Sequence, residues 1–319
     1  MLGSTLKILA GSSHPELAQL ISQKITRPIG ALHTRRFANG ETLVTVVDSV
    51  RDQDVFILQT AADPVNDLLM ELLITVNACK IASARQITVV LPCFPYARQD
   101  KKDRSRAPIT AKLVANMLQT AGCNHVITMD LHASQIQGFF DIPVDNVRCL
   151  YSETVMRDYI QQHYDISNVV IVSPDAGGAK RAAYIADKLK VDFALIHKER
   201  QVANEVSRMI LVGTVTGKTA IIVDDIADTC GTIALAARIL AEHGAEKCVA
   251  LVVHAFLSGR AVDVVESTPA LDEMVVANTV PLSPRARDCA KIRTMDVSAL
   301  LGEAIRRTHY GESISQLFL

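Results

Sequence analysis

The sequence predicts an α/β protein built of two tandem domains, each a mainly parallel sheet flanked by helices. Short apolar runs rich in β-branched residues alternate with helical patterns along the whole chain, as in layered α/β folds. Most of these runs are apolar at nearly every position, which is typical of strands buried on both faces of a parallel sheet. A length of 319 residues allows about two domains of ordinary size.

Individual elements follow from the same patterns. Helices are expected at 64–80 and 107–122, where apolar residues recur at helical spacing. Pro108 suits the first turn of the second helix, and Gly122 suits its C-terminal end. The expected strands are the apolar runs at 6–10, 54–58, 86–92, 125–130, 169–175, 219–225, 248–255 and 274–278.

A faint internal repeat indicates where the two domains meet. In each half, one strand ends in proline and a later strand ends in aspartate before a polar loop. The repeat pairs 89–98 with 169–181, and 127–135 with 220–232. We therefore predict a first domain at 1–147 and a second domain at 148–307. The tail, 308–319, is expected to pack on the first domain.

Charge and cysteine usage exclude several classes of protein. The chain has 33 Lys and Arg against 34 Asp and Glu, so it lacks the basic surplus of a general nucleic-acid binder. Its first residues are too short and too mixed an apolar stretch for a signal sequence or a membrane span. The seven cysteines form no CxxC pair, which favours buried free thiols over metal ligands. We expect a cytoplasmic protein with no nucleic-acid or membrane partner.

The segment 219–232 carries the strongest candidate site. Its apolar run ends in Asp224 and Asp225, at the strand end where ligands bind in open α/β sheets. Carboxylates there suit sugar hydroxyls or hydrated magnesium. A helix is expected to begin near Thr232, and its free amides would favour a phosphate. The alternative is simple N-capping beside an acidic turn, but the whole pattern DDxxDTxGT argues against it. The loop residues are Asp228, Thr229, Cys230, Gly231 and Thr232.

A second loop of this kind follows the run at 169–173. Its glycines would let backbone amides face a diphosphate, and Asp175 would reach an associated cation. Lys180 and Arg181 follow, either as anion contacts or as a solvated first turn; the helix dipole does not favour cations there. The loop comprises Asp175, Ala176, Gly177 and Gly178.

Three further polar segments follow predicted strands. The charged run at 98–106 stands where a binding loop belongs, so anion contact is favoured over a merely solvated face. His132 either caps a helix or ligates a metal bound to nucleotide. The segment at 197–204 is either a mobile lid bringing Lys198 and Arg200 over a reacting phosphate or an ordinary surface loop.

These motifs together resemble one family. The string VVDDIADTCGT resembles the ribose-phosphate-binding fingerprint of type I phosphoribosyltransferases and of phosphoribosyl pyrophosphate synthetases, class I. Resemblance to the synthetases extends to nearly the whole chain. It is carried by RRFANGE (35–41), FPYARQDKKDRSRAP (94–108), MDLHASQIQGFFDIPVDN (129–146), SPDAGGAKRA (173–182), KERQVANEV (198–206) and GESISQLF (311–318).

The resemblance implies two type I phosphoribosyltransferase-like domains and an ATP:ribose 5-phosphate pyrophosphotransferase serving nucleotide, histidine, tryptophan and NAD biosynthesis. Its reaction would require Mg²⁺, held by His132 and Asp175, with Lys198 and Arg200 as catalytic cations. Ribose 5-phosphate would bind Asp224, Asp225 and the 228–232 loop, with pyrophosphate at 175–178. The ATP contacts would be Phe37, Asn39, Glu41, Arg98, Gln99, Asp100, Lys101 and His132.

The resemblance also implies a homohexamer in which a neighbouring subunit supplies Phe37, Asn39 and Glu41. Asn39 stands where many bacterial members have Asp, and Cys230 where Gly is frequent. Activation by inorganic phosphate and inhibition by ADP would use one interface site. Its residues would be Ser49, Arg51, Ser105, Arg106, Asn146, Ser313 and Ser315. Two alternatives are a non-catalytic regulatory homologue and a phosphoribosyltransferase that consumes the activated sugar.

Overall fold

The computed structural model describes residues 5–102, 104–147, 155–199 and 208–315, with the backbone alone at 198, 199 and 208. The chain forms two compact units. Unit 1 comprises Met1–Val147, Thr279–Pro281 and Val297–Leu317. Unit 2 comprises Arg148–Asn278, Leu282–Asp296 and Phe318–Leu319.

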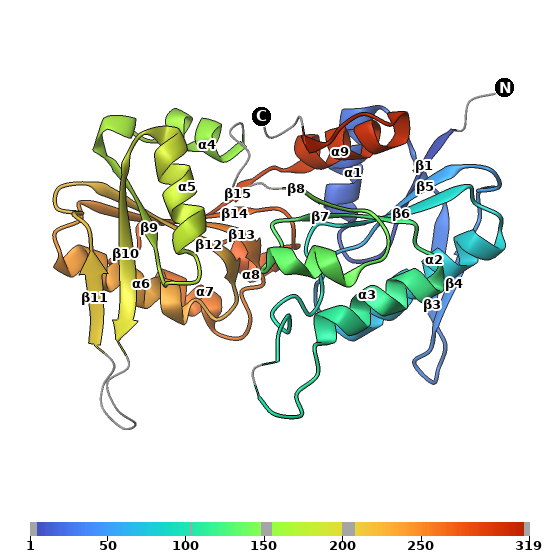
Figure 1. Ribbon diagram of the computed structural model, residues 1–319, viewed down its shortest axis with the longest axis horizontal. Coiled ribbons are helices and arrows are strands. Elements are labelled where there is room, and N and C mark those ends of the chain that lie inside the picture. The colour runs from blue at the N-terminus through green and yellow to red at the C-terminus, as the bar shows by residue number, and fades with distance from the viewer. Residues whose placement is uncertain (1–4, 103, 148–154, 200–207, 316–319) are drawn as a thin grey trace. The chain divides into compact units, whose positions relative to one another are not determined.

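Unit 1 is a parallel sheet covered by helices on both faces (Figure 1). Helices α1 (Pro15–Ile25) and α9 (Ser298–Tyr310) cover one face, and α2 (Val65–Ile81) and α3 (Thr110–Ala121) cover the other. Leu9 and Ile57 of the sheet pack with Leu72 of α2 and Leu118 of α3 in one buried cluster. The strands lie in the order β2 (Ile29–Gly30), β1 (Leu6–Ala10), β5 (Asp54–Leu58), β6 (Gln86–Leu91), β7 (His125–Met129) and β8 (Val144–Val147).

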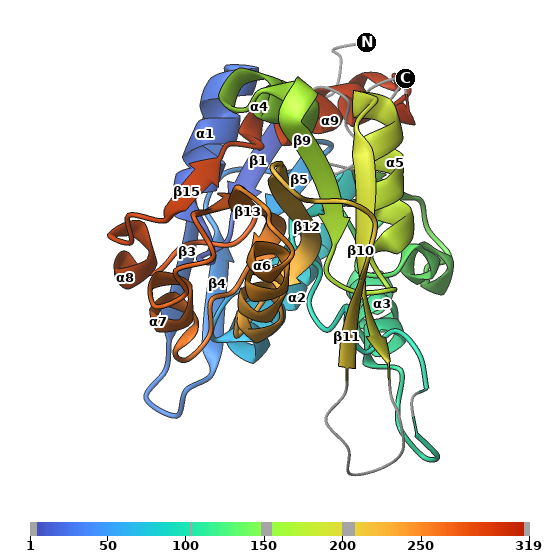
Figure 2. The same ribbon diagram turned by 90° about the vertical axis from the view of Figure 1, so that its left-hand side faces the viewer.

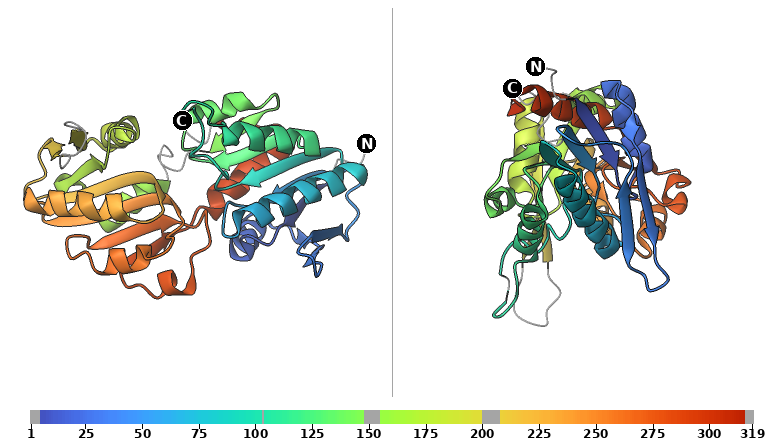
Figure 3. Two further views of the ribbon diagram at one scale, coloured as in Figure 1. Left: turned by 90° about the horizontal axis from the view of Figure 1, so that it is seen from below. Right: turned by 90° about the vertical axis from the view of Figure 1, so that its right-hand side faces the viewer.

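A separate antiparallel hairpin, β3 (Leu32–Arg36) and β4 (Thr42–Val46), extends from unit 1 (Figure 3). Arg36 forms a 2.6 Å ion pair with Asp67 of α2, so the turn end of the hairpin is held on that helix. A short 3-10 helix, η1 (Ser134–Phe139), connects β7 to β8.

Unit 2 repeats this architecture around a second sheet. Its strands lie in the order β11 (Arg208–Val212), β10 (Asp192–Glu199), β9 (Val169–Ser173), β12 (Thr219–Ala227), β13 (Lys247–Ala255), β14 (Glu273–Ala277) and β15 (Ile292–Met295). All neighbours are parallel except β10 and β11. Helix α5 (Ala179–Leu189) and helix α6 (Gly231–Glu242) lie on opposite faces (Figure 2). The remaining helices are α4 (Val155–His163), η2 (Ile166–Asn168), α7 (Ala261–Glu266) and α8 (Pro284–Arg287).

The two sheets share one order of connections, which corrects the repeat inferred from the sequence. Strands β1, β2, β5, β6, β7 and β8 correspond in turn to β9, β10, β12, β13, β14 and β15. The repeat inferred from the sequence made the end of β6 equivalent to that of β9, and the end of β7 equivalent to that of β12. The structure instead matches β1 with β9 and β5 with β12. Local endings in Pro or Asp do not reveal a strand's position in a sheet, which long-range pairing decides.

The last helix also differs from the sequence expectation. Residues 297–307 were assigned to the second domain, but α9 belongs to unit 1. A Cβ built on Gly302 would lie 3.0 Å from Ile25 of α1, which shows how closely the two helices approach. Near the end of α9, the His309 Nδ1 lies 2.8 Å from Asp54 Oδ2 at the start of β5.

Most of the predicted helices and strands are confirmed, and the differences concern where they begin and end. Gly122 caps α3 in the left-handed region with φ +118°, as expected. Pro108, however, precedes the N-cap Ile109 and lies outside the helix. Strand β12 continues to Ala227, two residues past the acidic pair. The polar segment after 197 is a strand as far as Glu199, because β10 pairs with β11 there.

Two further observations concern the length of the helices and the burial of the cysteines. Among the described residues, no helix is both long and apolar enough to cross a bilayer. Six cysteines are buried free thiols; Cys149 lies outside the described residues.

Candidate active site

Asp224 and Asp225 sit near the C-terminal end of β12, and their carboxyl groups lie within hydrogen-bond reach of each other. Asp225 faces α5, where Arg181 Nη1 donates to its Oδ1 over 3.0 Å. Asp225 is 6% exposed, whereas Asp224 is half-buried. The two acids therefore have different surroundings.

The electrostatics of Asp224 are unusual for a carboxyl group. Burial, as the largest cause, and the nearby negative charges of Asp225 and Asp175 together raise its pKa to about 8. A hydrogen bond from the backbone N–H of Asp225 to Asp224 Oδ1, 2.9 Å long, opposes these effects. We call Asp175, Asp224 and Asp225 the acidic edge. Three acids close together favour a ligand that supplies hydroxyl donors or a cation.

The loop after β12 brings a helix N-terminus to the same place. Asp228 and Cys230 separate β12 from α6, which begins at Gly231. The backbone N–H groups of Gly231 and Thr232 have no hydrogen-bond partner within the described part of the chain, as at any helix start. Both residues are exposed, as is Thr229. This loop offers amides and hydroxyls to an anion.

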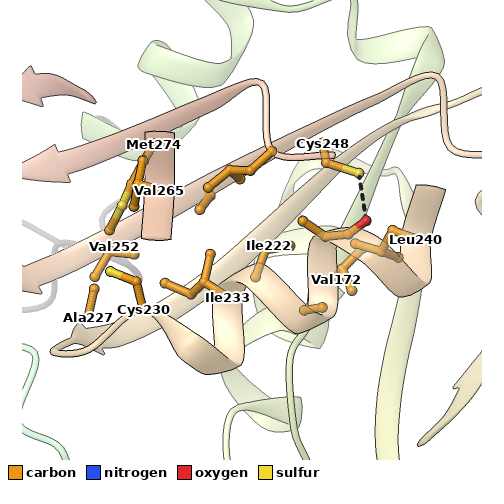
Figure 4. Close-up of a cluster of buried hydrophobic side chains, with 14 of the residues drawn as sticks. Val172, Ile222, Ala227, Cys230, Ile233, Leu240, Cys248, Val252, Val265 and Met274 are labelled. Carbon is orange, nitrogen blue, oxygen red and sulfur yellow. Dashed lines mark hydrogen bonds between the residues drawn. The ribbon is translucent and has the colours of Figure 1, made fainter. Parts of the chain in front are cut away.

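The side chain of Cys230 anchors this loop in the hydrophobic core of unit 2. Its backbone is left-handed, with φ +60°, and its side chain is 4% exposed. Figure 4 shows the thiol among Ala227, Val252 and Val265 in the core of unit 2. Burial raises the pKa of the thiol to about 12, with a smaller contribution from the charge of Asp228. The side chain is therefore neutral and faces away from any bound anion.

The loop at 174–178 is closed by its own hydrogen bonds. Asp175 Oδ1 accepts from the backbone N–H of Gly178 over 3.0 Å, and Ser173 Oγ donates to the Asp175 carbonyl over 2.7 Å. A Cβ on Gly178 would lie 2.9 Å from Ser173 Oγ, so close packing requires this glycine. Ala176 and Gly177 are exposed. Asp175 thus also shapes the loop that the sequence analysis assigned to pyrophosphate.

The predicted ATP residues of unit 1 fall into two groups. One group follows β6 and β7, neighbouring strands of the sheet. Gln135 Nε2 donates to the buried Asp100 over 3.0 Å, which joins the two loops, and Gln99 Oε1 accepts from Thr110 Oγ1 over 2.6 Å. Arg98, Lys101 and His132 are exposed. The N-cap of η1 is Ala133, so His132 does not cap it.

The second group forms the turn of the β3–β4 hairpin. Phe37 is 46% exposed, and the guanidinium of Arg35 lies 5.6 Å from the centre of its ring. Asn39 Oδ1 accepts from the backbone N–H of Glu41 over 3.2 Å. Among the described residues, none of the hydrogen bonds of these three turn residues reaches the loops after β6 and β7. The two predicted ATP groups are not joined within unit 1.

The remaining predicted residues are scattered. Lys198 lies on β10, and Arg200 is outside the described residues. Asn146 Oδ1 accepts from the backbone N–H of Leu131 over 3.2 Å, next to His132. The hydroxyls of Ser313 and Ser315 lie 3.1 Å apart. The other proposed effector residues, Ser49, Arg51, Ser105 and Arg106, are exposed.

Arg181 is the site residue whose role the sequence left open. It is neither a solvated side chain nor an exposed anion contact, because it is largely buried and paired with Asp225. The only available signal was a cation at a helix start, where the dipole disfavours it. A partner 44 residues away explains that position.

The fold and the site define a class of protein. Parallel α/β units with an acidic strand end beside a helix N-terminus are the phosphoribosyltransferase type of sugar-phosphate-binding fold. Residues 6–122 match the family model described as the N-terminal domain of ribose phosphate pyrophosphokinase. Residues 200–319 match the phosphoribosyl synthetase-associated domain.

Relatives match over the full length. Ribose-phosphate pyrophosphokinase 2 of Schizosaccharomyces pombe is 59% identical, with 100% of this chain and 98% of that protein aligned. Ribose-phosphate pyrophosphokinase 2 of Saccharomyces cerevisiae is 55% identical over the same shares. The crystal structure of phosphoribosylpyrophosphate synthetase from Mycobacterium smegmatis superposes with a TM-score of 0.90 at 40% identity, covering 97% of this chain and 100% of that one.

The chain therefore belongs to the ribose-phosphate pyrophosphokinase family. It is an enzyme that transfers pyrophosphate from ATP to O1 of ribose 5-phosphate. The alternatives of a phosphoribosyltransferase or a regulatory homologue are not favoured, because full-length relatives and a full-length structure carry the synthetase name.

Proposed function

We propose that ribose 5-phosphate binds at the C-terminal edge of the sheet of unit 2. The acidic edge supports this placement, because it gathers three carboxylates beside exposed amides of a helix start. Asp224 and Asp225 accept hydrogen bonds from the ribose hydroxyls or from water on a cation. The phosphate binds the loop of Asp228, Thr229, Cys230, Gly231 and Thr232, with Cys230 contributing its backbone alone.

The pyrophosphate end of the reaction is placed at Asp175, Ala176, Gly177 and Gly178. Oxygen ligands suit Mg²⁺, so the exposed Asp175 carboxylate fits a cation carried by nucleotide phosphates. His132 is proposed as a further ligand, although a hard cation prefers oxygen to nitrogen. Bound Mg²⁺ would neutralise charge on the transferred phosphates.

ATP is proposed to contact Arg98, Gln99, Asp100 and Lys101 of one subunit. Phe37, Asn39 and Glu41 would come from another subunit of a homohexamer. The hairpin supports this, because its turn is internally bonded and leaves the Phe37 ring exposed for stacking on a base. Inorganic phosphate is the proposed activator and ADP the inhibitor, at a site comprising Ser49, Arg51, Ser105, Arg106, Asn146, Ser313 and Ser315. The proposed location is the cytoplasm.

In the proposed mechanism, O1 of the sugar attacks the β-phosphorus of ATP. The new O1–P bond forms as the bond to the α-phosphate oxygen breaks, AMP leaves, and the hydroxyl proton passes to solvent. Lys198 and Arg200 stabilise the negative charge that spreads over the transferred group. Such a reaction depends on positioning and charge neutralisation.

The experiment is to incubate the protein with Mg²⁺, ATP and ribose 5-phosphate and to measure AMP, with and without inorganic phosphate. We expect stoichiometric AMP and the activated sugar. Lys198→Ala should lower kcat by roughly ten- to a few-hundred-fold, because the transition state loses the free energy of one charge-assisted hydrogen bond. Lys188→Ala, an exposed lysine on α5, is the matched control. Absence of AMP from folded protein would leave the regulatory alternative standing, and unchanged turnover of Lys198→Ala would remove its catalytic role.

A further inference from the structure

Arg181 and Asp225 form a buried ion pair next to the proposed sugar site. Their side chains are 13% and 8% exposed, and Nη1 lies 3.0 Å from Oδ1. Arg181 is in the first turn of α5, and Asp225 is on β12. The pair therefore connects the helix after the pyrophosphate loop to the strand that carries the acidic pair.

The position of Arg181 is unfavourable for the helix alone. A cation in the first turn opposes the helix dipole, and a long polar side chain loses freedom when buried. The compensating interaction is with Asp225, whose charge would otherwise be buried at 6% exposure close to Asp224. Removing one partner of such a pair leaves an uncompensated charge inside the protein.

The ion pair also holds the Asp225 carboxylate in place. Arg181 donates to it from α5, while the carboxylate stays within hydrogen-bond reach of the Asp224 carboxyl group. The backbone N–H of Asp225 meanwhile donates to Asp224 Oδ1 over 2.9 Å. Arg181 thus holds the side chain of Asp225, and the backbone amide of the same residue orients the Asp224 carboxyl group.

We propose that Arg181 is a positioning residue of the sugar site, which holds and neutralises Asp225 so that Asp224 is presented to the ribose hydroxyls. This inference rests on the proposed binding of ribose 5-phosphate at the acidic edge. Arg181 itself need not touch the substrate.

The test compares Arg181→Met, Arg181→Gln and Arg181→Lys with Arg238→Met, an exposed arginine on α6 that serves as the matched control. The measured quantities are KM for ribose 5-phosphate, KM for ATP, and Tm. KM is the decisive readout because it does not depend on the fraction of folded enzyme, whereas a merely structural role would lower only Tm and apparent kcat.

We expect Arg181→Met and Arg181→Gln to raise KM for ribose 5-phosphate about tenfold or more, the value of one charge-assisted contact. KM for ATP should stay within about twofold, Arg181→Lys should recover most of the loss, and Arg238→Met should match the unchanged enzyme. If Arg181→Met does not fold, Arg181→Gln, which keeps a hydrogen-bond donor, decides the matter. An unaltered KM for ribose 5-phosphate in either folded variant overturns the inference.

Asp224→Asn separates this inference from the placement of the sugar. If that variant leaves KM for ribose 5-phosphate unchanged, the sugar does not bind at the acidic edge and the proposed placement fails. If Asp224→Asn raises KM and Arg181→Gln does not, only the role of Arg181 fails.

Discussion

The two units carry equivalent sheet edges whose polar side chains differ in kind and in charge. The ends of β1 and β5 in unit 1 correspond to the ends of β9 and β12 in unit 2. In unit 1, this place is taken by Ser13, Gln59, Thr60 and Glu71, which we call the closed edge. Gln59 Oε1 accepts from Ser13 N over 3.1 Å, and its Nε2 donates to Glu71 Oε1 over 3.3 Å.

The polar groups of the closed edge form hydrogen bonds with one another and with the neighbouring backbone. Thr60 N donates to Ser13 Oγ over 2.9 Å, and Thr60 Oγ1 donates to the Thr279 carbonyl over 2.7 Å. A Cβ built on Gly11 would lie 2.5 Å from Gln59 Oε1, so Gln59 occupies the space above that loop. Unit 2 has Asp224 and Asp225 at the end of the equivalent strand. The same architecture therefore carries an internal hydrogen-bond network at one edge and, at the other, the acids that we propose bind the sugar.

The largest expected effect separates the two edges by activity. Asp224→Asn should lower kcat/KM for ribose 5-phosphate by about ten- to two-hundred-fold, because it removes one charge-assisted contact to the sugar. Gln59→Leu in the closed edge should leave KM for ribose 5-phosphate unchanged. Steady-state kinetics on both variants checks this, and a raised KM in Gln59→Leu would contradict the distinction.

The second prediction uses the pH dependence of stability. The pKa of Asp224 is about 8 in the folded chain, above its unfolded value, so the folded state retains a proton that the unfolded state releases. The free energy of unfolding should therefore fall as pH rises from about 4 to about 8, by at most about 1.4 kcal/mol per pH unit from this group. Urea titrations of the ligand-free enzyme and of Asp224→Asn should show a smaller slope in the variant. Equal slopes in the two proteins would contradict a raised pKa of Asp224 in the folded state.

A third prediction concerns the stability of the closed edge. Glu71 is 4% exposed and accepts from Ser12 N over 2.7 Å and Ser12 Oγ over 2.6 Å. Glu71→Ala should lower the free energy of unfolding by about 1–3 kcal/mol, because the two Ser12 donors and the buried Gln59 Nε2 lose an acceptor. Gln23→Ala, exposed on α1, should change it by no more than about 0.5 kcal/mol. KM for ribose 5-phosphate should stay the same in both variants.

The smallest effect tests the anchor of the phosphate loop. Cys230→Ser and Cys79→Ser each place a hydroxyl in an apolar core, at a cost of about 1–3 kcal/mol in stability. Cys79 is fully buried on α2, and burial raises the pKa of its thiol to about 12, as in Cys230. Only Cys230→Ser should raise KM for ribose 5-phosphate, by a few-fold, since only Cys230 lies beneath the loop. Equal KM values in the two variants would argue against an anchoring role.

Those parts of the molecule that depend on local pattern could be predicted from the residues alone. Apolar runs identified the buried strands, and helical spacing identified α2 and α3. The string at 223–232 identified the acidic strand end and the helix that follows it, and the motifs along the chain identified the family. These features are legible because alternation, capping and motif spacing are properties of neighbouring residues.

Which distant segments come into contact could not be predicted in this way. The observed order of strands differs from the predicted internal repeat, and α9 belongs to unit 1. Arg181 forms an ion pair with Asp225, 44 residues further along the chain. The closing of the unit 1 edge by Gln59 was equally invisible, since a lone glutamine after an apolar strand carries no distinctive pattern. Strand order, ion pairs and filled space depend on contacts between residues far apart in the chain, and those contacts are chosen by packing and by the burial of charge.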